Sequence, residues 1–205
     1  FGDRHYVPIL KWRRGEQLAL RELDPQVRGR LTPLIEIPPV TWDYENDCPA
    51  KTIDEHVNGV ADSIRRNWGD RPAFIDLPWC QDDRVSGGRL AVEKVFDDLL
   101  AADQPAIPVT GLARSTNYQS AVRTIVARDR LGVCIRIEPE DWEDPGVLNQ
   151  EVSELCDELG VQREQCDLLI DFKSVAGVSV GSIVLLATSL LGMLDGINEW
   201  RTLIW

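Results

Sequence analysis

Short apolar segments of strand length alternate along this chain with longer segments of helical periodicity, and this alternation limits its fold to a few architectures. The strand candidates cover residues 6–12, 31–37, 72–78, 106–112, 132–138, 167–173 and 201–205. The helix candidates cover residues 15–30, 52–68, 87–103, 117–130, 146–160 and 179–197. Thr52 and Glu55 have the spacing of a capping box at the start of the second helix. A strand and a helix in roughly every 30 residues predict parallel strands joined by right-handed crossovers.

Two architectures contain such strands, the open doubly wound sheet and the closed (β/α) barrel. A doubly wound dinucleotide-binding sheet has a glycine-rich turn after its first strand. Here that strand ends in "LKWRRGEQ", which holds a single glycine, and the sequence contains no P-loop motif. We therefore predict an α/β fold with the architecture of a TIM-type (β/α) barrel.

The number of strand–helix units falls short of a complete barrel. Six units and a seventh strand, about six and a half βα units, are present, whereas a complete barrel has about 250 residues. We expect residues 1–205 to form a single barrel domain that is truncated after its seventh strand. An unpaired strand ending in Leu203, Ile204 and Trp205 would favour self-association.

Charged residues lie near the carboxyl ends of the predicted strands, although the strands are otherwise apolar. Side chains of a strand alternate between its two faces. The charged positions share one phase across five strands: Lys11, Glu36, Asp76, Arg136, Glu138, Asp171 and Lys173. We expect the β-branched face to pack on helices and the charged face to point into the barrel. Catalytic residues of such barrels lie at the carboxyl ends of the strands, so a functional site is predicted there.

The residue types at these ends limit the chemistry of the site. With only two histidines in the chain, carboxylate and lysine chemistry remains, as does a divalent metal (magnesium or manganese) on oxygen ligands. The catalytic candidates are Glu36, Asp76, Glu138, Asp171 and Lys173. The ligand-binding candidates are Lys11, Arg114, Arg136, Trp12 and Trp79. The nearly balanced charges also fit an ionic network that satisfies itself, and this alternative stays open.

The loop positions among these candidates have alternative interpretations too. Trp12 and Trp79 each follow a strand end, where a tryptophan either forms the floor of a pocket or anchors the loop. Arg114 either grips an anion or belongs to the capping segment of the next helix, in which Ser115 is an N-cap candidate.

Charge, hydropathy and cysteine content limit the kinds of partner and the cellular compartment that we expect for this chain. A net charge of −12 argues against general binding of nucleic acids. No apolar run is long enough for a membrane span, and the most apolar segment, residues 180–197, predicts a buried helix. Five widely spaced cysteines without a CxxC pair, and a charged start without a signal peptide, lead us to expect free thiols in the cytoplasm.

Two hypotheses for function follow from these features. The first is a barrel enzyme that binds or acts on a small anionic or phosphorylated ligand, as a metal- or carboxylate-dependent phosphoester hydrolase. The second is a non-catalytic module for ligand sensing or protein interaction, in which a protein partner or self-association is expected. Convergent charges favour the first, and the absence of a mechanistic motif favours the second.

Three stretches of the chain carry a family resemblance. The segment "YVPILKWRRGEQLALRELDPQVRGRLTPLIEIPP", the later "FIDLPW" and the "RIE" stretch resemble the phage-type Beta protein family, named after a protein of T-even phages and present in bacteria. The similarity runs along the length of the chain. The resemblance implies no reaction, because the family is uncharacterised, but its distribution implies a role in phage–host conflict, that is, in phage defence.

Overall fold

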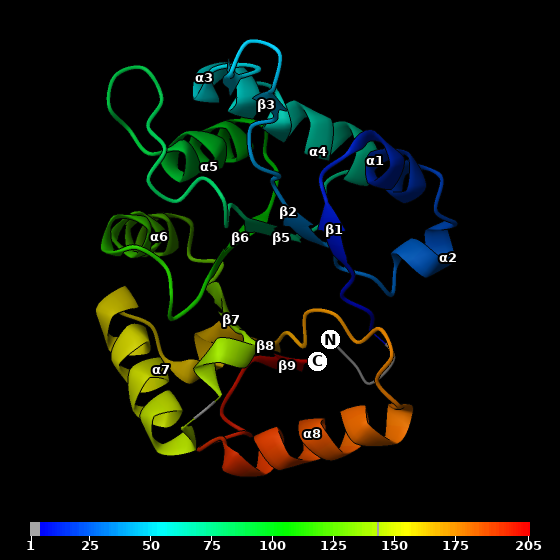
Figure 1. Cartoon of the computed structure of the whole chain (residues 1–205), viewed down its shortest axis with the longest axis vertical. Coiled ribbons are helices and arrows are strands. Elements are labelled where there is room, and N and C mark those ends of the chain that lie inside the picture. The colour runs from blue at the N-terminus through cyan, green and yellow to red at the C-terminus, as the bar shows by residue number, and fades with distance from the viewer. Residues whose placement is uncertain (1–4, 143) are drawn as a thin grey trace.

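The computed structural model describes residues 5–142 and 144–205, and its centre is one curled parallel sheet (Figure 1). The sheet has seven strands in the order β1-β2-β5-β6-β7-β8-β9. Their bounds are β1 (Ile9–Lys11), β2 (Leu34–Glu36), β5 (Ala73–Asp76), β6 (Ala106–Thr110), β7 (Val133–Ile137), β8 (Cys166–Ile170) and β9 (Thr202–Ile204). All neighbouring pairs are parallel. The predicted α/β class and parallel strands are therefore confirmed.

The curled sheet forms a half-barrel. No ladder joins the described residues of β1 and β9, which are the first and last strands of the order. Closure into a TIM-type barrel is therefore not confirmed and stays a prediction. Each predicted strand is present, although each is shorter than its apolar segment in the sequence.

Helices surround the outside of the curled sheet (Figure 1). They are α1 (Arg14–Arg21), α2 (Pro25–Arg28), α3 (Ile53–Val57), α4 (Val60–Trp68), α5 (Ala91–Ala101), α6 (Thr116–Asp129), α7 (Pro145–Leu159) and α8 (Val180–Met193), with short 3₁₀ turns at Pro139–Asp141 and Arg163–Gln165. The predicted capping box is confirmed, because Thr52 and Glu55 each accept a hydrogen bond from the other's backbone N–H. The single helix predicted over 52–68 is wrong, since Gly59 has a φ of +74° and separates α3 from α4.

The two faces of the sheet bury different sets of side chains. Ile35, Ile75 and Ile135 face the helices and belong to the main core. A second apolar cluster lies on the concave face and consists of Leu34, Phe74, Ile107, Val109, Cys134, Leu169 and Ile204, with Val7 packed against it. The predicted assignment of faces is confirmed, because this concave face is in phase with the charged strand ends.

A small hairpin between β2 and α3 was not predicted from the sequence. It consists of β3 (Trp42–Asp43) and β4 (Cys48–Pro49), which pair antiparallel. The Asp43 carboxylate accepts hydrogen bonds from the backbone N–H groups of Glu45 and Asn46, and these bonds close the turn. The hairpin follows the carboxyl end of β2, and its residues Trp42 and Tyr44 line the groove described below.

The most apolar helix is more exposed than its sequence predicted. Only Ala187 and Leu190 of α8 are buried, whereas Val180, Val184 and Leu185 are exposed. The prediction of a buried helix is therefore wrong, because the described part of the chain covers only one side of α8. None of the helices that the structure describes has the length and apolar character of a membrane span. All five cysteines are free thiols.

Candidate functional site

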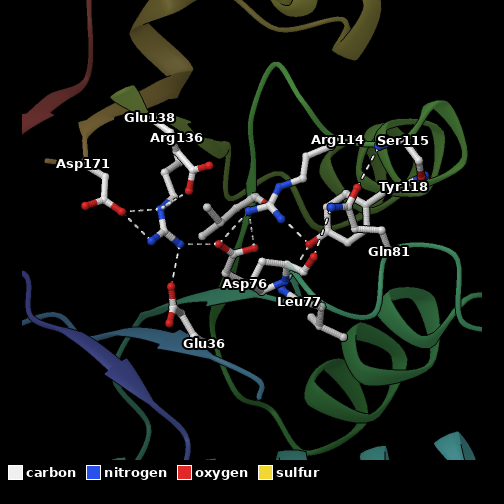
Figure 2. Close-up of polar contacts among 12 residues, drawn as sticks. Glu36, Asp76, Leu77, Gln81, Arg114, Ser115, Tyr118, Arg136, Glu138 and Asp171 are labelled. Carbon is white, nitrogen blue, oxygen red and sulfur yellow. Dashed lines mark hydrogen bonds and ion pairs between the residues drawn. The ribbon is translucent and has the colours of Figure 1, made fainter. Parts of the chain in front are cut away.

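Seven charged side chains meet at the carboxyl ends of the strands, and we call them the charge cluster. They are Glu36, Asp76, Arg114, Arg136, Glu138, Asp171 and Lys173. Parallel register places the strand ends side by side, since Lys11 is paired with Glu36 and Glu36 with Asp76 along the sheet. Figure 2 shows how side chains from β2, β5 and β7 meet around Arg136.

Arg136 is the centre of the charge cluster. Its Nη1 donates to Glu36 at 2.7 Å and to Asp76 at 2.9 Å, and its Nε donates to Asp171 at 2.9 Å. Its Nη2 also donates to Asp171, and Glu138 lies 3.4 Å from Nε. Burial to 6% exposure opposes the charge, but Asp76, Asp171 and Glu36 raise the pKa of Arg136 above its ordinary value. Every nitrogen of this guanidinium is therefore already paired.

Asp76 is the most deeply buried carboxylate of the cluster. Arg114 donates to its two oxygens at 3.0 and 2.9 Å, and Arg136 donates to one of them. Burial raises the pKa of Asp76, while the charges of Arg114 and Arg136 oppose that rise. The Arg114 guanidinium also lies 5.8 Å from the ring centroid of Tyr118. Arg114 therefore pairs with Asp76, and Ser115 is the N-cap of α6, as its position predicted. Binding of an anion by Arg114 stays a prediction.

The outer candidates pair with one another. Positions near the ends of neighbouring strands predict an ion pair of Lys173 with Glu138 and one of Asp171 with Arg136, and the structure has both. Lys11 lies 5.6 Å from the ring centroid of Trp79 in a cation–π contact. Trp12, by contrast, is buried among helix-facing side chains and is not part of the charge cluster.

Within the part of the chain that the structure describes, the cleft that touches the charge cluster is small. The cleft above it measures about 70 Å³, which is space for about two water molecules. Gly111 belongs to its wall, and a Cβ there would lie 2.7 Å from the Arg136 carbonyl oxygen. Asp141 also lines this cleft, and burial raises the pKa of its carboxyl. Four carboxylates and three cations leave one negative charge in excess, which disfavours an anionic ligand.

The ion pairs of Arg136 also determine whether the charge cluster could hold a metal ion. A guanidinium occupies the position between the carboxylates where a divalent ion would have to sit. Among residues 5–142 and 144–205, no group of three or more His, Cys, Asp or Glu side chains is arranged to hold a metal. The donor set therefore does not fit a resident magnesium or manganese ion.

A much larger groove lies beside the cluster, at the carboxyl ends of β1 and β2. It measures about 850 Å³ and is bounded by the start of α1, the β3–β4 hairpin and the α3–α4 segment. Its lining includes Arg13, Arg14, Lys51, Trp12, Trp42 and Tyr44. We call it the cationic groove, because within the described chain no Asp or Glu lines it.

The three cations of the groove differ from those of the charge cluster. Arg13, Arg14 and Lys51 are all exposed, and none forms an ion pair with a described carboxylate. Arg13 is also the N-cap of α1, and Gly59, the N-cap of α4, lines the same groove. Neither N-cap supplies a side-chain hydrogen bond, but each first turn holds an acidic residue, Glu16 in α1 and Asp62 in α4, so the helix starts add little to the binding of an anion.

Two buried ring nitrogens belong to residues of the groove wall. The Nε1 of Trp12 and the Nδ1 of His56 have no hydrogen-bond partner among the described residues. The Nε2 of His56 lies 2.6 Å from the Pro38 carbonyl oxygen, so Nε2 carries the proton and Nδ1 has a lone pair. Burial lowers the pKa of His56, which keeps the ring neutral near pH 7.

Sequence reasoning found Trp12 but missed the rest of this groove. The one signal for it was the arginine pair in "WRRGEQ", which follows the first strand directly and therefore lies at a strand's carboxyl end. Lys51, Trp42 and Tyr44 lie in a loop segment without strand or helix periodicity, so no pattern marked them.

The fold and the site define an α/β protein with a curled parallel sheet, a buried charge cluster and an adjacent cationic groove. The model of the Beta protein family matches residues 6–205, nearly the whole chain. The chain therefore belongs to the Beta protein family, as the resemblance of its "PLIEIP" and "FIDLPW" segments predicted. A search of curated proteins finds no match to it.

Proposed function

We propose that this protein binds a small anionic or phosphorylated ligand in the cationic groove, at the carboxyl-end face of its sheet. The observation that carries the proposal is the positive charge of Arg13 and Arg14, which form no ion pair with a described carboxylate, together with Lys51, whose charge acts on the nearby Glu55 without a direct ion pair, in a groove without lining carboxylates. In a chain with a net charge of −12, such a local excess of cations needs a reason. An anionic ligand supplies one.

Electrostatics favour the groove over the charge cluster. Two unit charges 4 Å apart attract by about 4 kcal/mol where the effective dielectric constant is near 20, and part of this attraction survives partial exposure to solvent. At Arg136 the same attraction is already used by Glu36, Asp76 and Asp171. An anion entering there would have to displace a carboxylate, whereas in the groove it meets cations without one.

We assign the charge cluster a supporting role. The backbone N–H of Trp12 donates to the Glu36 carbonyl at 2.8 Å, and that of Ile37 donates to the Asp76 carbonyl at 2.8 Å. Trp12 and Ile37 both line the groove. By fixing Glu36 and Asp76, the ion pairs of Arg136 hold the inner wall of the groove in place.

Of the two functional hypotheses, this geometry supports ligand binding better than hydrolysis of a phosphoester. Glu36, Asp76 and Asp171 each accept a hydrogen bond from Arg136, so each carboxylate already has a partner within the protein. A general base or acid needs a free position at the substrate. The catalytic assignment of Glu138 and Lys173, and the role in phage–host conflict, stay predictions.

The test is a titration of the protein with inorganic pyrophosphate in an isothermal calorimeter, carried out at two salt concentrations. We expect the unaltered protein to bind and the Arg13→Gln/Arg14→Gln variant to bind at least tenfold more weakly. The control is Arg30→Gln/Arg123→Gln, which removes two exposed arginines outside the groove and should change affinity less than twofold. An unaltered protein that does not bind at millimolar pyrophosphate, or equal loss in both variants, would overturn the proposal.

A further inference from the structure

The groove joins its cations to exposed aromatic rings. Trp42 and Tyr44 of the β3–β4 hairpin line it, with exposures of 43% and 89%. Their positions, two residues apart, place both side chains at the same groove. Exposed aromatic faces beside positive charge are the combination that binds nucleobases and phosphates together, because a base stacks on the ring while the phosphate pairs with the cation.

The size of the groove exceeds what a simple anion needs. Its volume of about 850 Å³ lies in the range of sites for cofactors and other ligands with several rings. Pro38 and Pro39 form part of its wall, and their fixed φ angles make that wall stiff. A phosphate or carboxylate alone would leave the aromatic part of this space to water.

The two unpartnered ring nitrogens of the wall are complementary in type. The Nε1–H of Trp12 can only donate, and the Nδ1 lone pair of His56 can only accept. Trp12 is 7% exposed, and a buried polar atom without a partner costs free energy. Because both atoms are buried, neither forms a contact with a ligand in the groove as the structure stands, and the assignment of the ligand rests on the exposed rings and cations.

We infer that the ligand of the cationic groove is a nucleoside phosphate. Its base stacks on Trp42 and Tyr44, and its phosphate lies at Arg13, Arg14 and Lys51. This inference rests on the proposed anion site and adds to it the class of ligand. A single nucleotide, rather than a nucleic acid, fits the net charge of −12.

The experiment compares probes that share a phosphate but differ in the base. The four ribonucleoside 5′-monophosphates, ribose 5-phosphate and the free nucleosides are titrated against the whole chain by calorimetry. We expect at least one nucleotide to bind tenfold or more tightly than ribose 5-phosphate. The Tyr44→Leu and Trp42→Leu variants should each weaken nucleotide binding about fivefold or more and leave ribose 5-phosphate unchanged, because only the base meets the rings.

The matched control is Trp79→Leu, which removes a tryptophan of nearly the same exposure, 44%, that does not line the groove. Tyr44 is so exposed that its variant keeps the test valid if Trp42→Leu fails to fold. Equal affinity for nucleotides and ribose 5-phosphate, unaffected by Tyr44→Leu, would overturn the nucleotide class and leave the anion site standing. If no phosphate compound binds, both the inference and the proposed function fall.

Discussion

Replacing Arg136 by methionine tests whether the charge cluster supports the fold. The substitution keeps an unbranched apolar stem but removes the guanidinium that contacts Glu36, Asp76 and Asp171. All three carboxylates are buried, so water does not readily replace the lost cation. Breaking a buried ion pair from one side costs about 3–5 kcal/mol, because the remaining charge is left without compensation.

That cost is large against the stability of a typical domain, about 5–15 kcal/mol. We therefore expect Arg136→Met to lower the free energy of unfolding by at least about 3 kcal/mol at pH 8. The loss should be smaller at pH 5. Burial already raises the pKa of Asp76, and removing Arg136 raises it further. A carboxyl with a raised folded-state pKa contributes its stability below its ordinary pKa, and this contribution is lost as the pH rises through the raised value.

Urea unfolding at pH 5 and pH 8, followed by circular dichroism, measures both effects. The control is Arg89→Met, which removes one partner of Asp97 at a half-exposed ion pair while Arg128 still pairs with Asp97, and it should cost less than about 1 kcal/mol. Adding Asp171→Asn to Arg136→Met should recover part of the loss, since it removes one of the uncompensated charges. A loss below about 1 kcal/mol that is equal at both pH values would refute the supporting role of the cluster.

Three further predictions concern single positions and are each checked by urea unfolding. Gly111→Ala should lower the free energy of unfolding by about 1–3 kcal/mol, because its Cβ would lie 2.7 Å from the Arg136 carbonyl oxygen; the control Gly15→Ala, which meets nothing within 4 Å, should leave stability equal or higher. Tyr118→Phe should cost about 1–3 kcal/mol, because the buried hydroxyl both donates to and accepts from backbone groups, and an unchanged midpoint would contradict this. The lowered pKa of His56 means that the unfolded chain binds more protons around pH 6, so stability should fall as the pH drops through about 6.5, and His56→Gln should flatten that fall.

The sequence alone was sufficient to predict which strand residues lie in the charge cluster. Two simple rules place them there, the alternation of side chains along a strand and the parallel register of neighbouring strands. Alternation along a strand sends Leu34 and Glu36 to the same face, and parallel register then brings Glu36 beside Asp76. Neighbouring strands also predict the pairs of Glu138 with Lys173 and of Arg136 with Asp171. The contacts of Arg136 with Glu36 and Asp76, on more distant strands, require distances that the sequence does not supply. Whether the cluster satisfies itself could therefore not be decided before the contacts of Arg136 were known.

The helices and loops show where such reasoning stops. Residues 52–68 have helical periodicity on both sides of Gly59, and the extended backbone of Asn58 followed by the left-handed backbone of Gly59 breaks the helix. The hairpin has two strands of two residues each, too short for alternation to mark them. The groove unites three segments that are distant in the sequence, and each contributes side chains without a repeat.

The two sites divide the carboxyl-end face according to the cost of removing charge from water. In the concave interior, where Asp76 is fully buried, each charge must have a partner within the protein, so arginines and carboxylates neutralise one another there. At the rim Arg13 and Arg14 remain hydrated, and they can stay unpaired at little cost. A ligand that brings its own negative charge gains most where the protein has not already supplied it. We therefore propose that the charge cluster, which first suggests a site, serves the fold, and that the hydrated cations beside it bind the ligand.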